Sequence, residues 1–292
     1  MQVPVGLLLL TSGLLCAQTD VRELLEKKTL ARIEHLDQNL DGALGFAAID
    51  LTTGRTLSYN ATAVFPTASS IKLPIMIELF RQARAGGLRL DQQVPLTPAD
   101  LVDGSLRLAV MLRRGATTAT VRELLEAMIE VSDNSATNKL IDLVGMDRVN
   151  RNLDALGFPE TRLRRKMMDW VDTEHRENIS TPLEMARLME AVYRGKAGHE
   201  ADCAEMLKIM KRVEAAMRAA VPARVEVAAK PGEIPGVHCE TGIVFIPKRP
   251  FALAVMSAFI DDAKNPVAEV TSIVYSLFDQ LGRSNRYGHR LE

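Results

Sequence analysis

The chain has 292 residues, with 36 lysine and arginine residues against 37 aspartate and glutamate residues, and its formal net charge is -1. It is 47% hydrophobic and 25% charged, the balance of a soluble globular protein, which excludes a disordered or fibrous chain. The near-zero charge and an isoelectric point near 6.6 argue against a nucleic-acid binder, which needs a basic surface. The length suffices for one or two domains.

Residues 3–15 are almost wholly apolar and are followed by Cys16 and Ala17. This run is too short to span a bilayer, which needs about 20 residues, and no later stretch is long and apolar enough. A short apolar run that ends at a small residue predicts a secretory signal over residues 1–17 and export to the periplasm or the medium. Two alternatives stay open: a buried N-terminal helix, and a lipid anchor at Cys16, which the bulky Leu15 disfavours.

Signal removal leaves two cysteines, Cys203 and Cys239. An exported protein can join such a pair in a disulfide. Two separate buried thiols are the alternative, and the sequence decides for neither.

In the first half of the chain, a surface helix and a β-hairpin precede a series of helices. Thr120 and Glu123 have the spacing of a capping box, which predicts that a helix begins at residue 121. The predicted elements are a helix over residues 20–37, a hairpin within 43–60, and helices over 69–84, 121–130, 134–143 and 146–156.

The second half predicts a long loop, more helices and a return to strands. Residues 158–180 have many charges and no period, and Pro266 begins a last helix with an apolar face. The other predicted elements are helices over 182–193 and 200–220 and strands over 225–230, 242–246 and 251–260.

Strands at both ends of the chain can share one sheet if the helical block between them is an insertion. We therefore expect two lobes, a sheet lobe formed by the two ends of the chain and an inserted lobe of helices. The sheet lobe comprises residues 18–66 and 221–292, and the helical lobe comprises residues 67–220. A cleft between two such lobes is a common place for an active site.

The first chemical motif is S-x-x-K, formed by Ser69 and Lys72. Positions three apart share a helix face, so Lys72 is expected within reach of the Ser69 hydroxyl. A lysine can take a proton from that hydroxyl only if burial or positive neighbours lower its pKa, and the apolar flanks favour burial. Alone the motif is weak, because it also arises as a surface capping pattern.

Two further motifs follow in order. Ser132, Asp133 and Asn134 form S-D-N between two predicted helices, where a helix cap is the alternative interpretation. Lys230 and Gly232 form K-x-G at the end of a strand-like run, where the alternative is a strand followed by a turn.

S-x-x-K, S-D-N and K-T-G together are typical of class A β-lactamases and penicillin-binding proteins. The chain resembles the class A β-lactamase-like serine hydrolases over about residues 44–281, including the hairpin before Phe65-Pro66 and the Thr181-Pro182 pair after the long loop. The resemblance implies an α/β fold with an antiparallel sheet flanked by helices and an all-α lobe. It also implies that Ser69 attacks a β-lactam or peptide carbonyl in a monomeric enzyme that needs no cofactor.

The resemblance also implies roles for the other motif residues. Lys72 would be the base, Ser132 would pass a proton to the leaving nitrogen, and Lys230 would steer a substrate carboxylate. Asn134 would hold the substrate amide. The backbone N–H groups of Ser69 and Glu233, beside Gly232, would form the oxyanion hole.

The third motif departs from the family pattern, because Pro231 stands where the family has a threonine or serine that binds the substrate carboxylate. Proline has neither a hydroxyl nor an N–H group. The next strand reads His238-Cys239-Glu240-Thr241 and has no arginine to pair with that carboxylate. Loss of one charge-assisted hydrogen bond weakens binding by roughly 1.5–3 kcal/mol.

The long loop departs as well, because the place of the family's deacylating glutamate falls on Met167. Asp169 is the nearest carboxylate, and the alternative role for it is a salt bridge with Arg164 or Arg165. Without a base in the loop, an acyl-enzyme would form and persist. The sequence therefore predicts a β-lactamase of low efficiency, with a penicillin-binding-like peptidase or esterase, or a non-enzymatic β-lactam sensor, as alternatives.

Metal chemistry is not expected. No HExxH or C-x-x-C motif is present, and the five histidines are scattered along the chain. They are His35, His175, His199, His238 and His289.

Overall fold

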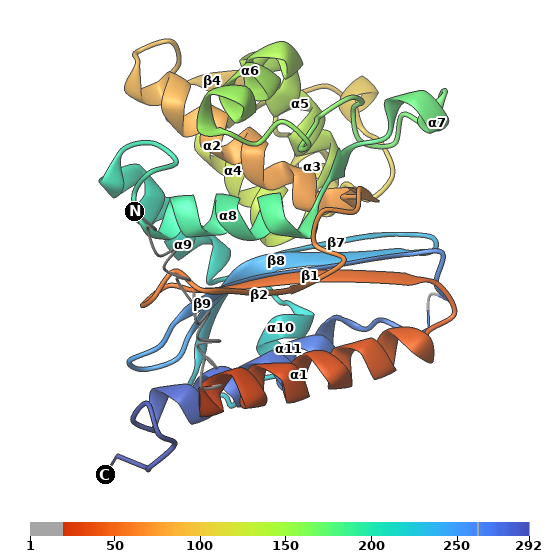
Figure 1. Cartoon of the computed structure of the whole chain (residues 1–292). Helices are drawn as coiled ribbons and strands as arrows, with labels where there is room; N and C mark the ends of the chain where they lie inside the picture. Colours follow the sequence, from red (N-terminus) through yellow and green to blue (C-terminus); the bar gives the residue numbers. More distant parts are fainter. Residues whose placement is uncertain (1–19, 262, 292) are drawn as a thin grey trace, which may run out of the picture.

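A five-stranded antiparallel sheet lies at the centre of the computed structural model, which describes residues 20–261 and 263–291 (Figure 1). The strand order is β2-β1-β9-β8-β7, so strands from the two ends of the chain pair directly. The strands are β1 (Ala43–Asp50), β2 (Thr56–Tyr59), β7 (Glu226–Ile234), β8 (Val237–Phe245) and β9 (Phe251–Ala258).

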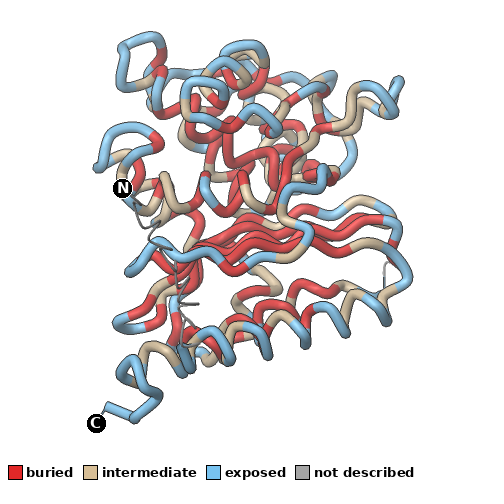
Figure 2. Tube along the Cα trace, viewed as in Figure 1, coloured by how far each residue is buried: buried red, intermediate tan, exposed pale blue. Residues whose placement is uncertain are grey.

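Both faces of this sheet are covered. On β1, Ala47 and Ile49 belong to one hydrophobic core while Phe46 and Ala48 belong to a second, as expected when successive side chains point to opposite faces. The long strands β8 and β9 are almost entirely buried, and the sheet therefore separates two cores (Figure 2).

Three helices cover one face of the sheet: α1 (Val21–Gln38), α10 (Ala216–Ala219) and α11 (Val267–Gly282) (Figure 1). Helix α8 (Pro182–Tyr193) lies on the opposite face, between the sheet and the helical block. The block comprises α2 (Lys72–Arg84), α3 (Leu106–Arg113), α4 (Val121–Glu130), α5 (Asn134–Val144), α6 (Met146–Leu156) and α9 (Glu200–Met210).

Short elements join these layers. They are β3 (Phe65–Pro66), the 3-10 turns η1 (Ala68–Ile71) and η2 (Pro98–Asp100), β4 (Gln93–Pro95), β5 (Thr118–Thr120), α7 (Thr173–Arg176) and β6 (Ile179–Ser180). β3 pairs with β6, and β4 pairs with β5.

The predicted antiparallel sheet and helical block are confirmed, but several bounds were wrong. The helix expected over 69–84 begins with η1, and the helix expected over 200–220 is interrupted between α9 and α10. Pro231 lies within β7 rather than after it. This is possible because β7 is an edge strand, where the missing N–H costs least. The region 158–180 also contains β6 and α7, and α3, β4 and β5 were not predicted.

We propose that the sheet lobe and the helical lobe divide at residues 66 and 220. The predicted signal over residues 1–17, with Cys16, lies outside the described residues. Among the helices of residues 20–261 and 263–291, none combines the length and hydropathy needed to cross a bilayer.

Cys203 on α9 and Cys239 on β8 are both buried free thiols. The Cys239 thiol donates to the Pro66 carbonyl at 3.0 Å, and burial raises its pKa to about 12. The structure therefore has the two thiols rather than a disulfide.

The capping box that begins α4 is present: the Thr120 hydroxyl accepts from the Glu123 N–H at 3.1 Å, and Glu123 Oε2 accepts from the Thr120 N–H at 2.7 Å. We predict that Thr120→Ala lowers the free energy of unfolding by about 1 kcal/mol, the usual value of an N-cap. Urea denaturation measures this, with Thr118→Ala, an exposed threonine of the same strand, as the matched control. An equal loss in both variants would show that the cap contributes nothing.

Candidate active site

Ser69 lies in η1, immediately before α2, and its side chain is partly exposed. The turn is fastened on two sides. Thr67 donates to the Asn178 carbonyl through both its N–H (2.9 Å) and its hydroxyl (3.0 Å), and the Ser70 hydroxyl donates to the Lys230 carbonyl at 3.2 Å. Ala68 has a φ of 43°, a strained conformation for a residue with a Cβ atom. The surrounding hydrogen bonds therefore hold Ser69 in a turn that the chain would not adopt alone.

Lys72 is the first residue of α2 and is fully buried. Its Nζ lies 2.6 Å from the Ser132 carbonyl, 2.9 Å from Ser132 Oγ and 2.8 Å from Asn134 Oδ1. The spacing of the motif places Lys72 within reach of Ser69. The hydrogen bonds of Nζ to other described residues go to Ser132 and Asn134 of the S-D-N turn.

Burial, reinforced by the positive charge of Lys230, holds the pKa of Lys72 well below its usual value. Loss of its proton leaves an amine with two N–H donors and one lone pair. The Ser132 carbonyl and Asn134 Oδ1 can only accept hydrogen bonds. The Ser132 hydroxyl is thus the one partner that can donate to the lone pair, and it links Lys72 to the cavity.

The S-D-N turn places Ser132 beside both lysines. Ser132 has a φ of 56°, and Asp133 caps α5 by accepting from the Ala136 N–H at 2.9 Å. The second carboxylate oxygen of Asp133 accepts from the Leu108 N–H at 2.8 Å, which fastens α3 to the turn. The cap interpretation of this motif therefore applies to Asp133, while Ser132 is free to face Lys72.

Lys230 on β7 reaches the same hydroxyl from the opposite side. Its Nζ donates to Ser132 Oγ at 3.1 Å and to the Pro231 carbonyl at 2.8 Å, and the residue is fully buried. Burial lowers the pKa of Lys230 to about 7, although the nearby Glu240 opposes this shift. The structure thus brings Ser132 together with both lysines of the flanking motifs.

Gly232 is required by a close approach between β7 and η1. A Cβ atom at this position would lie 2.6 Å from the Thr67 carbonyl oxygen and 2.7 Å from the backbone nitrogens of Ser69 and Ser70. All three contacts are with backbone, which cannot move aside. Glu233, the other residue predicted for the oxyanion hole, follows on the same strand.

An open cavity of about 630 Å³ joins these residues. Lys72 and Lys230 do not line it themselves, but both contact Ser132, which does. The cavity is lined by Ser69, Gly104, Leu106, Val131, Ser132, Asn134, Glu214, Ala215, Ala216, Pro231, Gly232, Glu233 and Glu240.

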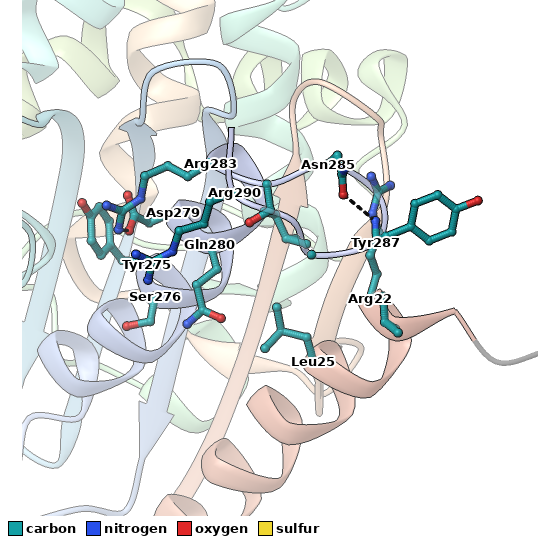
Figure 3. Close-up of a pocket in the computed structure, with 14 residues that line it drawn as sticks. Arg22, Leu25, Tyr275, Ser276, Asp279, Gln280, Arg283, Asn285, Tyr287 and Arg290 are labelled. Carbon is teal, nitrogen blue, oxygen red and sulfur yellow. Dashed lines mark hydrogen bonds and ion pairs between the residues drawn. The ribbon is translucent and has the colours of Figure 1, made fainter. Parts of the chain in front are cut away.

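A second cavity, of about 520 Å³, lies between the start of α1, the end of α11 and the C-terminal segment (Figure 3). Arg22, Tyr275 and Arg290 line it, and its Asp279 is paired with Arg283. No lysine or histidine is among the described residues that line it, and its one carboxylate is held in that ion pair. We therefore take the cavity at Ser69 as the candidate active site.

Two asparagines hold the loop over residues 158–180. Asn138 Oδ1 accepts from the Met167 N–H at 2.8 Å, and Asn138 Nδ2 donates to the Met167 carbonyl at 3.1 Å. Asn178 accepts from the Arg164 and Arg165 N–H groups and donates to the Arg165 carbonyl. Sequence reasoning missed both, although Asn138 lies one helical turn after Asn134 on α5.

The loop carboxylates form ion pairs within the loop. Asp169 pairs with Arg176 at 2.9 Å, so the salt bridge weighed from the sequence exists, with a different arginine as partner. Arg165 pairs with Glu177 and lies over the half-exposed Trp170 ring at 4.7 Å. No residue of 158–180 lines the Ser69 cavity.

His238 lies on β8 and is buried. Its Nδ1 is 3.2 Å from Oε1 of Glu233 on the neighbouring strand β7. Within residues 20–261 and 263–291, no cluster of three His, Cys, Asp or Glu side chains could hold a metal ion.

The fold places Ser69 on a turn and brings two buried lysines to a second serine, Ser132. This arrangement is that of a serine hydrolase. Residues 27–278 match the family model described as "Beta-lactamase enzyme family". The β-lactamase AST-1 of Nocardia asteroides is 30% identical over 86% of this chain and 83% of its own length. The chain therefore belongs to the β-lactamase enzyme family and is a serine hydrolase of the class A type.

Solved structures agree with this assignment. An ancestral class A β-lactamase has a TM-score of 0.79 and 27% identity, covering 86% of this chain and all of its own. A structure of PBP-A has a TM-score of 0.78 at 24% identity, covering 86% of this chain and 96% of that chain, and shows the shared fold.

We predict that Gly232→Ala slows acylation of Ser69 by a penicillin at least about 100-fold, because a displacement of about 1 Å at a reacting group has that cost. Gly198→Ala is the matched control, since nothing lies within 4 Å of its added Cβ atom and its φ is not positive. Rapid-quench mass spectrometry gives the rates, and thermal melting checks the fold. Equal rates in both variants would show that the close approach is not needed.

The buried Glu240 carboxyl group makes the free energy of unfolding depend on pH. Burial raises its pKa from 4.5 to about 7, although the Ala216 and Met217 N–H groups and Lys230 oppose the shift. The native state therefore holds this proton more tightly than the unfolded state. The associated stabilisation is complete below pH 4.5 and is lost as the pH rises through 7.

Glu240→Gln cannot titrate at this position. Between pH 4.5 and 8 its free energy of unfolding should rise relative to wild type by up to about 3 kcal/mol. The variant also loses one acceptor for the α10 N–H groups, but this cost is the same at every pH. Urea denaturation at the two pH values measures the change, and a constant difference would contradict the prediction.

Proposed function

We propose that this enzyme opens the β-lactam amide through an acyl-enzyme on Ser69 and that its deacylation is slow. The observation that carries the first step is the convergence of Lys72 and Lys230 on Ser132 Oγ, at 2.9 and 3.1 Å, in the wall of the cavity that Ser69 also lines. The proposal extends to this chain the activity named for its relatives.

In the first step, Ser69 Oγ attacks the lactam carbonyl and gives up its proton. Neutral Lys72 is the base, and its lone pair becomes available when the Ser132 hydroxyl rotates toward the leaving nitrogen. The lactam C–N bond breaks, and the proton passes from Lys72 through Ser132 Oγ to that nitrogen. The N–H groups of Ser69 and Glu233 would receive the developing oxyanion.

Asn134 has a structural role in addition to the proposed contact with the substrate amide. Its Oδ1 accepts from Lys72 at 2.8 Å and its Nδ2 donates to the Asp103 carbonyl at 2.9 Å. A substrate amide would therefore share Asn134 with these partners. We expect Asn134 to position Lys72 as well as the substrate.

Deacylation needs a base that activates water. Met167 occupies the loop position tied to Asn138, and Asp169 is engaged with Arg176. Since no loop residue lines the cavity, the acyl-enzyme would persist, as in penicillin-binding proteins. A peptidase or esterase with slow deacylation is the second candidate function, and this loop is the observation that favours it.

Export of a monomeric enzyme through the signal over residues 1–17 remains part of the proposal. The substrate would be a β-lactam or a peptide of the cell wall.

The first test is intact-protein mass spectrometry over time with benzylpenicillin. Wild type should gain one penicillin mass that decays over minutes to hours, and Ser69→Ala should gain none. Ser58→Ala is the matched control, because this exposed serine of β2 does not line the cavity. An adduct on Ser69→Ala, or none on wild type, would refute the proposed nucleophile.

Two variants identify the cause of slow decay. Asp169→Asn should leave the adduct lifetime unchanged within about twofold, since the carboxylate does not reach the cavity. Met167→Glu should shorten it at least about tenfold, because the family resemblance gives this position to the general base of deacylation, although Met167 itself does not line the cavity. A longer lifetime in Asp169→Asn would instead identify Asp169 as the deacylating base.

A further inference from the structure

The charged residues that line the cavity are all acidic. Glu214, Glu233 and Glu240 line the cavity together with Ala215, Ala216 and Pro231. No lysine, arginine or histidine is among the described residues that line it. A ligand in this cavity therefore meets three carboxylates and no exposed cation.

Glu240 is the buried member of this group. It lies opposite Pro231 in the β7–β8 pairing and is only 2% exposed. Its two carboxylate oxygens accept from the Ala216 N–H at 3.0 Å and the Met217 N–H at 2.9 Å. Both oxygens are thus fixed in place, and the two N–H groups that might have bound an anion are already occupied.

Pro231 supplies no compensating donor. It lies between Lys230 and Gly232 and has neither a hydroxyl nor an N–H group. The Lys230 ammonium is fully buried and is directed to Ser132 Oγ and to the Pro231 carbonyl. The carboxylate of a substrate beside Pro231 in the cavity would therefore find the Glu240 charge nearby without a directed donor.

We propose that Glu240 and Pro231 make the enzyme select acyl donors that carry a neutral or cationic group, rather than a carboxylate, beside the scissile bond. This inference rests on the proposed function, because it concerns the substrate of Ser69. A like charge held in a partly desolvated site repels more strongly than one in water. Neutral amides and esters avoid this repulsion, and a cationic group would be attracted.

The test compares benzylpenicillin with the amide of its own carboxylate, so that the lactam and the acyl side chain are identical. The rate of Ser69 acylation at pH 8 is divided by the rate of hydroxide hydrolysis for each compound, which removes their difference in intrinsic reactivity. Wild type should prefer the neutral amide at least tenfold on this scale. Mass spectrometry of wild type and Ser69→Ala shows that the reaction is at Ser69.

Variants of Glu240 and Pro231 test whether these two residues cause the preference for the neutral amide. Glu240→Gln removes the charge and should shift the ratio toward benzylpenicillin about tenfold. Pro231→Thr restores a hydroxyl on the edge strand and should shift it in the same direction, and it leaves the α10 contacts of Glu240 intact. Glu226→Gln is the matched control, because this exposed glutamate of β7 pairs with Lys211 and does not line the cavity.

The outcomes separate the two proposals. Faster acylation by the amide, reduced in Glu240→Gln or Pro231→Thr and unchanged in Glu226→Gln, supports the inference. Equal or faster acylation by benzylpenicillin overturns it and leaves the Ser69 mechanism standing. A preference that neither variant changes also overturns it. Acylation by neither compound removes the proposed function and this inference together.

Discussion

The site depends on burying two lysine amino groups against one hydroxyl. Lys72 and Lys230 are both fully buried and both contact Ser132 Oγ. Lowering the pKa of Lys230 to about 7 corresponds to roughly 5 kcal/mol of unfavourable free energy for its charged form. The structure tolerates this because the carbonyls of Ser132 and Pro231, Asn134 Oδ1 and the carboxylate of Glu240 surround the two amines. The same burial that costs stability produces a lysine able to take a proton at neutral pH.

That arrangement requires three separate segments to be held within fractions of an ångström. η1 is fastened to β7 through Ser70 and Lys230, and to the long loop through Thr67 and Asn178. The S-D-N turn is fastened to α3 and α5 through Asp133. Each of these contacts joins a side chain to backbone, and all except the Asp133 cap of α5 join segments far apart in the sequence. Gly232 completes the set, because only a residue without a Cβ atom lets β7 reach the Ser69 backbone.

The sequence was sufficient for the sheet, the helical block and the residues that gather at Ser132, because periodicity and three short motifs are local properties. It failed where distant segments decide the outcome. Helix spacing places Lys72 within reach of Ser69, but it does not reveal that Nζ binds Ser132, 60 residues later. Pro231 was expected to follow a strand, but β7 continues through it as an edge strand. Asp169 was paired with the wrong arginine, since its partner in the folded loop is Arg176.

Glu240 is a residue whose role the sequence alone does not reveal. The sequence shows only that its strand has no arginine to pair with a substrate carboxylate. The structure adds that its carboxylate is buried, bonded to the first N–H groups of α10, and that the residue lies opposite Pro231 in the β7–β8 pair. An arginine at this position would leave those N–H groups without their acceptor, whereas glutamate satisfies them and places an acidic group in the wall of the cavity. The side chain that we propose to select the substrate is thus also the one that holds the start of α10.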